Sequence, residues 1–159
     1  SLSLAFLVIA ILIGLLFRQV RIALICLVPN ALPLLAGYAL LGWLGWYLQP
    51  SSALVFTVAL GIAVDDTIHL MARYKESLRN GDGIPAAVET AVVRAGGAVL
   101  ITTLVLCVGF GVNALSAFQQ MTVLGLLGAT VIFTALLCDL FVLPALLIVG
   151  DKKASSHSH

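Results

Sequence analysis

Apolar residues fill the chain in long runs, and short polar segments separate one run from the next. A helix needs about 20 apolar residues to cross a bilayer. Five runs reach or approach that length and predict transmembrane helices at residues 2–17, 22–42, 52–72, 96–115 and 121–149. The pattern therefore predicts an all-α membrane protein, with one transmembrane domain over residues 1–150. Residues 151–159, ending in ASSHSH, are expected to form a disordered cytoplasmic tail with too few histidines for a metal site.

The longest polar segment lies between the third and fourth runs and has a pattern of its own. NGDG, at residues 80–83, is typical of a turn. Pro85 suits the first turn of a helix. The sequence PAAVETAVVRA that begins there predicts a short amphipathic helix on the cytoplasmic face of the membrane.

The composition excludes most other classes of protein. Of the 159 residues, 62% are hydrophobic and 9% are charged, whereas about a quarter of the residues in a soluble domain are charged. No basic patch with interleaved aromatic residues suggests nucleic-acid binding. Three single cysteines within the apolar runs, Cys26, Cys107 and Cys138, form neither a disulfide framework nor a zinc pattern and are expected to be buried.

The positive charges predict the orientation in the membrane. All eight Lys and Arg residues fall on one side of the five-helix arrangement, and the loops on the other side contain none. The positive-inside rule then puts the C-terminus in the cytoplasm and the N-terminus outside. Trp43, Trp46 and Tyr47 are expected at the outer interface. No signal-peptide pattern precedes the first run, and a chain that starts within a helix is expected to belong to a longer protein.

The stretch GIAVDDTIHL, residues 61–70, puts two adjacent acids and a histidine inside the third run. An Asp at the centre of a transmembrane helix costs about 2.5–3.5 kcal/mol and usually faces a bundle interior or a water-filled path. Asp65 and Asp66 also repel each other in a poor dielectric, which favours keeping a proton on the pair. His69 lies one turn after Asp65 and is a candidate partner, because histidine is the residue type most often used for proton exchange at neutral pH. Gly61, one turn before Asp65, predicts a close approach by a neighbouring helix.

Polar residues of other runs fall at a similar depth, judged from the rise of about 1.5 Å per residue. Thr102, Thr103 and Asp139 are therefore candidate relay partners of the acid pair. Structural interpretations stay open for each of them. A threonine often hydrogen-bonds the backbone of its own helix, and a lone acid can be satisfied by a backbone group or water. Asn30, within VPNALP, belongs to the same layer but could instead cap a helix break.

These residues resemble a known family. LGIAVDDTIHLMARYKE is similar to the Gly-x-x-x-Asp-Asp signature in the fourth helix of the resistance-nodulation-division (RND) superfamily. The similarity is strongest to the branch of exporters related to the mycobacterial large membrane proteins and Patched. LVPNALPLL resembles the preceding helix, and the stretches 95–118 and 124–147 resemble the last two. The resemblance covers residues 2–149 and matches helices two to six of one half of an RND transporter, with the C-terminal half favoured.

The resemblance implies part of a proton-driven exporter of the bacterial inner membrane, with no enzymatic activity and no cofactor besides the coupling proton. In that family the acid pair forms the proton relay, so Asp65 and Asp66 take this role by position. Thr102 and Thr103 match threonines that face the relay. Implied partners are the bilayer, a hydrophobic or lipid-like substrate, and the remainder of the transporter, namely a first helix, a periplasmic domain and the other half.

Three other functions compete with export. A sterol-sensing domain is the same five-helix bundle and could act as a lipid sensor or scaffold without either acid. An intramembrane aspartyl protease would need Gly-x-Gly-Asp, which this chain lacks, although it contains the short PAL sequence at residues 144–146. A metal-dependent lipid transferase would need more acids at ligand spacing. The acid pair favours transport over all three.

Overall fold

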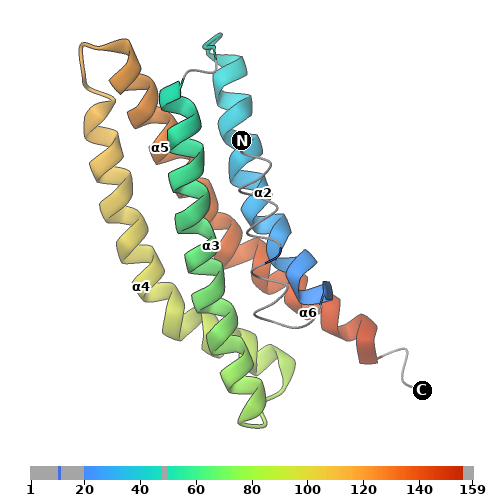
Figure 1. Ribbon diagram of the computed structural model, residues 1–159. Helices are drawn as coiled ribbons and strands as arrows, with labels where there is room; N and C mark the ends of the chain where they lie inside the picture. Colours follow the sequence, from blue (N-terminus) through green and yellow to red (C-terminus); the bar gives the residue numbers. More distant parts are fainter. Residues whose placement is uncertain (1–10, 12–19, 48–49, 156–159) are drawn as a thin grey trace.

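The computed structural model describes Ile11, residues 20–47 and residues 50–155, and these parts of the chain are almost entirely helical (Figure 1). The elements are α2 (Val20–Trp43), α3 (Pro50–Arg79), α4 (Ile84–Asn113), α5 (Gln119–Leu137), the π-helix η1 (Cys138–Val142) and α6 (Leu143–Ser155). Four stretches are long and apolar enough to cross a membrane: Ile25–Trp43, Ser52–Arg79, Ile84–Asn113 and Gln119–Gly150. They correspond to four of the five predicted spans. The fifth, residues 2–17, lies outside the described residues except for Ile11.

The predicted separate amphipathic helix is wrong, because α4 runs without interruption from Ile84 to Asn113. Ala87, Val88 and Ala91 are buried in the protein core, so packing holds the first turns of α4 against the other helices. The turn before α4 is confirmed: Gly81 has a φ of 95°, which glycine adopts readily. The proline predicted for the first turn of the helix is confirmed as well.

The last apolar run is one helical path that changes geometry in its middle. Between α5 and α6, the π-helix η1 (Cys138–Val142) lets the backbone N–H of Leu143 donate to the carbonyl of Cys138. Pro144 follows directly; it has no N–H, and its ring clashes with the carbonyl of Leu140 in a regular α-helix, which favours a wider turn. Short π-helices inside α-helices are frequently found at functional sites. α6 continues to Ser155, so the start of the tail expected from residue 151 is helical.

The core consists of two apolar clusters with a layer of polar residues between them. The lower cluster in Figure 1 contains Cys26, Leu70, Met71, Tyr74, Ala87, Val88, Ala91, Ala95, Leu143 and Leu147. The upper cluster contains Leu34, Leu41, Val55, Phe56, Ala59, Leu60, Val123, Leu127, Val131 and Ile132. Five of the seven buried polar residues in the described part of the chain fall between these two sets: Asn30 on α2, Asp66 and Thr67 on α3, Thr103 on α4, and Asp139 in η1. The other two, Ser52 and Ser77, lie towards the ends of α3.

Close helix packing occurs at other glycines than the one expected. Gly61 is exposed, and a Cβ built there would meet no atom within 4 Å in the described part of the chain, so the close contact expected at Gly61 is not found. At Gly125 and Gly128 of α5, by contrast, a Cβ would overlap α4. The α4–α5 hairpin therefore depends on two glycines that the sequence did not single out.

Polar and aromatic side chains mark the two ends of the bundle. The α2–α3 and α4–α5 connections lie at one end, and the α3–α4 turn and the last residues of α6 lie at the other (Figure 1). Arg73, Lys75 and Arg79 are in the last turns of α3, towards the end of the bundle at which α6 also ends. At the opposite end Trp43 and Tyr47 are 84% and 87% exposed. This separation matches the charge pattern in the sequence.

Candidate functional site

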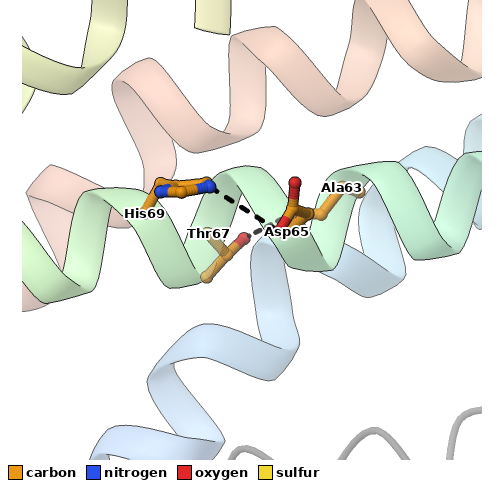
Figure 2. Close-up of polar contacts among 4 residues, drawn as sticks. All are labelled: Ala63, Asp65, Thr67 and His69. Carbon is orange, nitrogen blue, oxygen red and sulfur yellow. Dashed lines mark hydrogen bonds and ion pairs between the residues drawn. The ribbon is translucent and has the colours of Figure 1, made fainter.

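The two adjacent acids of α3 point in different directions, because consecutive residues of an α-helix lie about 100° apart. The side chain of Asp65 is 72% exposed, whereas Asp66 is buried with 9% of its surface exposed. His69 lies one turn after Asp65, and its Nε2 is 3.7 Å from an Asp65 carboxylate oxygen (Figure 2). The histidine is therefore next to the outward-facing acid, as the sequence predicts.

Both acids reach one open pocket of about 240 Å³ between α3 and α4. The pocket is lined by Asp65, Asp66, His69, Arg73, Arg94, Ala95, Ala98, Val99 and Thr102. Arg73 also donates to Glu76 at 2.9 Å, one turn closer to the basic end of the bundle. The acids therefore share a cavity with three groups that can carry positive charge: His69, Arg73 and Arg94. The buried carboxyl of Asp66 is reached from outside through this pocket.

The two threonines of α4 take different positions. Thr102 lines the pocket, but its hydroxyl donates to the carbonyls of Ala98 and Val99, at 3.2 and 3.0 Å, in its own helix. Thr102 therefore bonds the backbone of its own helix, which is the structural role that the sequence left open, and it also lines the pocket that holds Asp65 and Asp66. Thr103 is 1% exposed and does not line the pocket. Only the first of the two is positioned to contact a group bound between the helices.

Asp139 belongs to a second polar group, buried on the other side of α3. The Thr67 hydroxyl is 2.7 Å from one carboxyl oxygen of Asp139 and 2.9 Å from the carbonyl of Ala63. The side-chain amide of Asn30 donates to the Thr67 oxygen at 3.1 Å and to the carbonyl of Cys26 at 2.7 Å. Asn30, Thr67 and Asp139, which we call the buried triad, thus connect α2, α3 and η1.

Asp66 links the pocket and the buried triad along α3, because it lines the pocket and directly precedes Thr67. Asn30 does not cap a helix break, because α2 continues through both of its prolines. Thr67 was not singled out from the sequence. The signal was present: it directly follows the acid pair, and its helical position puts it on a different face from Asp65.

The described residues contain no group of three or more His, Cys, Asp or Glu side chains that could hold a metal ion. The two polar sites bring together carboxyl, imidazole, hydroxyl and amide groups, which can form hydrogen bonds, and the carboxyl and imidazole groups can exchange protons.

Comparisons with known proteins give the family. The sequence model of the MMPL family matches residues 2–158. This chain belongs to the MMPL family. The family matches the RND branch that the acid motif resembles, which confirms that resemblance.

Two relatives of this MMPL domain are named as membrane proteins. MJ1562 of Methanocaldococcus jannaschii is 34% identical over 136 residues, which are 86% of this chain and 35% of that protein. ActII-3 of Streptomyces coelicolor is 32% identical over 109 residues, 68% of this chain and 15% of that protein. The chain thus spans about a third or less of the length of each relative. It is an MMPL membrane domain with several helices that can span a bilayer.

Proposed function

We propose that this domain is the membrane part of a proton-driven, RND-type exporter of hydrophobic or lipid-like substrates. Asp65 and Asp66 are its proton carriers, His69 and Thr102 are their partners in the pocket, and Thr103 supports the relay from the buried layer. The domain is not an enzyme. It resides in the cytoplasmic membrane of a bacterium, with its basic end in the cytoplasm. It functions with a first helix, a periplasmic domain and a second transporter half.

One observation carries this proposal: an exposed acid and a buried acid, adjacent in the sequence, open into the same pocket. A transported proton must reach a site from one side and leave it towards the other. We assign proton uptake from the open pocket to Asp65, and transfer towards the interior to Asp66. One proton crossing 100 mV supplies about 2.3 kcal/mol, which can drive a conformational step if the exposure of its site alternates.

The test is gradient-dependent export by the transporter that carries this domain, normalised to the amount of protein in the membrane. Asp65→Asn and Asp66→Asn keep the shape of the side chain but remove its titration, so each should abolish export without loss of protein from the membrane. Thr102→Ala should weaken export less, because the hydroxyl already bonds its own helix. Glu89→Gln, at an exposed residue of α4 that does not line the pocket, is the acid-to-amide control and should leave export intact.

Normal gradient-dependent export by the Asp65→Asn/Asp66→Asn double variant would overturn the proposal. The domain would then be better explained as a lipid sensor or scaffold of the sterol-sensing kind, which needs neither acid. Loss of export with retained binding of a lipid-like cargo is the result expected of a pump whose relay has been removed.

A further inference from the structure

The buried triad is enclosed more completely than the pocket. Asn30, Thr67 and Asp139 are 1%, 0% and 1% exposed. One carboxyl oxygen of Asp139 and the side-chain oxygen of Asn30 have no hydrogen-bond partner in the described part of the chain. A buried carboxylate with its full charge needs several donors or a cation. Here Asp139 has one hydrogen-bond partner, the Thr67 hydroxyl.

The hydrogen atoms available to the triad decide between its two protonation states. Thr67 has one hydroxyl hydrogen and three polar neighbours, the Ala63 carbonyl, the Asn30 amide and Asp139. The two amide hydrogens of Asn30 are both used, on Cys26 and on Thr67. If Asp139 is ionised, the single hydrogen of Thr67 must serve both the carboxylate and Ala63. One of these two short contacts is then left without a hydrogen.

A protonated Asp139 uses every one of these contacts. Its own O–H donates to Thr67 at 2.7 Å, and the Thr67 hydroxyl then donates to Ala63 at 2.9 Å. The Thr67 oxygen accepts from both Asp139 and Asn30, which fits its two lone pairs. The result is a neutral, continuous chain of hydrogen bonds from η1 through α3 to α2. Each of its short contacts then has one hydrogen atom between donor and acceptor.

The ionisable neighbours agree with a neutral carboxyl. Asp66 acts on Asp139 from α3, and the thiols of Cys26 on α2 and Cys138 in η1 also interact with it. A second negative charge beside Asp66 would be repelled. No ion pair of Asp139 with a basic residue occurs in the described part of the chain.

We propose that Asn30, Thr67 and Asp139 form a second proton-binding site, separate from the Asp65–Asp66 pocket, with its proton on Asp139 in this structure. Loss of that proton reverses the Thr67–Asp139 hydrogen bond: the Thr67 hydroxyl turns to donate to the carboxylate, and its bond to the Ala63 carbonyl is lost. The site thereby couples proton occupancy to the hydrogen bond that Thr67 makes with its own helix α3, and to the direction of its bond with the π-helix. A role of this second site in export depends on the proposed function. The binding of a proton at Asp139 does not depend on it.

The test is infrared difference spectroscopy on the full-length transporter, recorded as pH is raised. A protonated-carboxyl band should remain in the Asp65→Asn/Asp66→Asn double variant and disappear when Asp139→Asn is added. Thr67→Val, which replaces the hydroxyl with a methyl group of similar size, should shift that band to higher frequency, while Thr67→Ser should restore it. Should Asp139→Asn fail to reach the membrane, the Thr67→Val and Thr67→Ser pair still identifies the band.

Two results would overturn the proposal. In the first, the double variant has no protonated-carboxyl band that responds to Thr67→Val. In the second, replacing potassium with sodium at constant pH removes the band, which would make the triad a cation site. The proposed function is tested separately. If export does not depend on the proton gradient while the Asp139 band behaves as expected, the second proton-binding site is supported and the proton-driven exporter is rejected.

Discussion

Gly125→Ala should destabilise the domain, because the α4–α5 hairpin packs backbone against backbone at this residue. The added Cβ would lie 2.6 Å from the carbonyl oxygen of Phe110 and 2.8 Å from the carbonyl carbon of Asn113, and would overlap the backbone nitrogen of Ala114. Side-chain rotation cannot relieve contacts with backbone atoms. The helices must therefore move apart or α4 must bend, and both reduce packing in the upper cluster.

The magnitude follows from two opposing effects. Overpacking in a tight core costs about 1–3 kcal/mol, and rigid backbone contacts favour the upper end of that range. Alanine gains about 1 kcal/mol over glycine in helix propensity. The net loss is about 2 kcal/mol, or roughly 30-fold in the ratio of folded to unfolded protein.

The assay is equilibrium unfolding in mixed micelles with increasing SDS, followed by circular dichroism. Gly109→Ala is the matched control, because it lies in α4 near the same hairpin and a Cβ there meets no atom within 4 Å. This control should be neutral or stabilising by up to about 1 kcal/mol. Equal unfolding midpoints for the two variants would refute the close-packing argument.

Two further predictions test the topology and the core. In a cysteine-free background, Ala117→Cys in the α4–α5 connection should react with a membrane-impermeant thiol reagent from outside intact cells, whereas Asn80→Cys in the α3–α4 turn should react only after the membrane is opened; the reverse pattern would invert the orientation. Leu127→Ala, at a side chain 1% exposed in the upper cluster, should lower the free energy of unfolding by about 2–5 kcal/mol. Leu104→Ala, at a side chain 50% exposed, should change it by no more than about 0.5 kcal/mol in the same SDS titration.

The features that depend on composition and spacing could be predicted from the sequence. Four spans, the turn at residues 80–83 and the proximity of His69 to Asp65 all follow from hydropathy, turn chemistry and the helical repeat. The family follows from the acid motif and its neighbouring helices. These features depend on residues that are close in the sequence, so they can be predicted without knowing which helices contact one another.

The features that depend on contacts between helices could not be predicted in this way. The sequence alone does not show which face of α3 meets η1, so Thr67 was missed and Asn30 was open to a capping role. The continuity of α4 depends on burial of its first turns, which hydropathy assigns to a separate surface helix. The expected contact at Gly61 failed for the same reason, since a glycine permits close approach without choosing its partner.

The polar layer between the two apolar clusters has a mechanical consequence. Packing is continuous within each cluster, so each half of the bundle resists deformation as a unit. Between them, the buried contacts among α2, α3 and η1 include a few hydrogen bonds centred on one hydroxyl. A hydrogen bond contributes only about 1 kcal/mol net and can be exchanged for another of similar strength. We therefore expect the bundle to deform first at the polar layer, where a change of one proton exchanges hydrogen bonds and leaves both clusters packed.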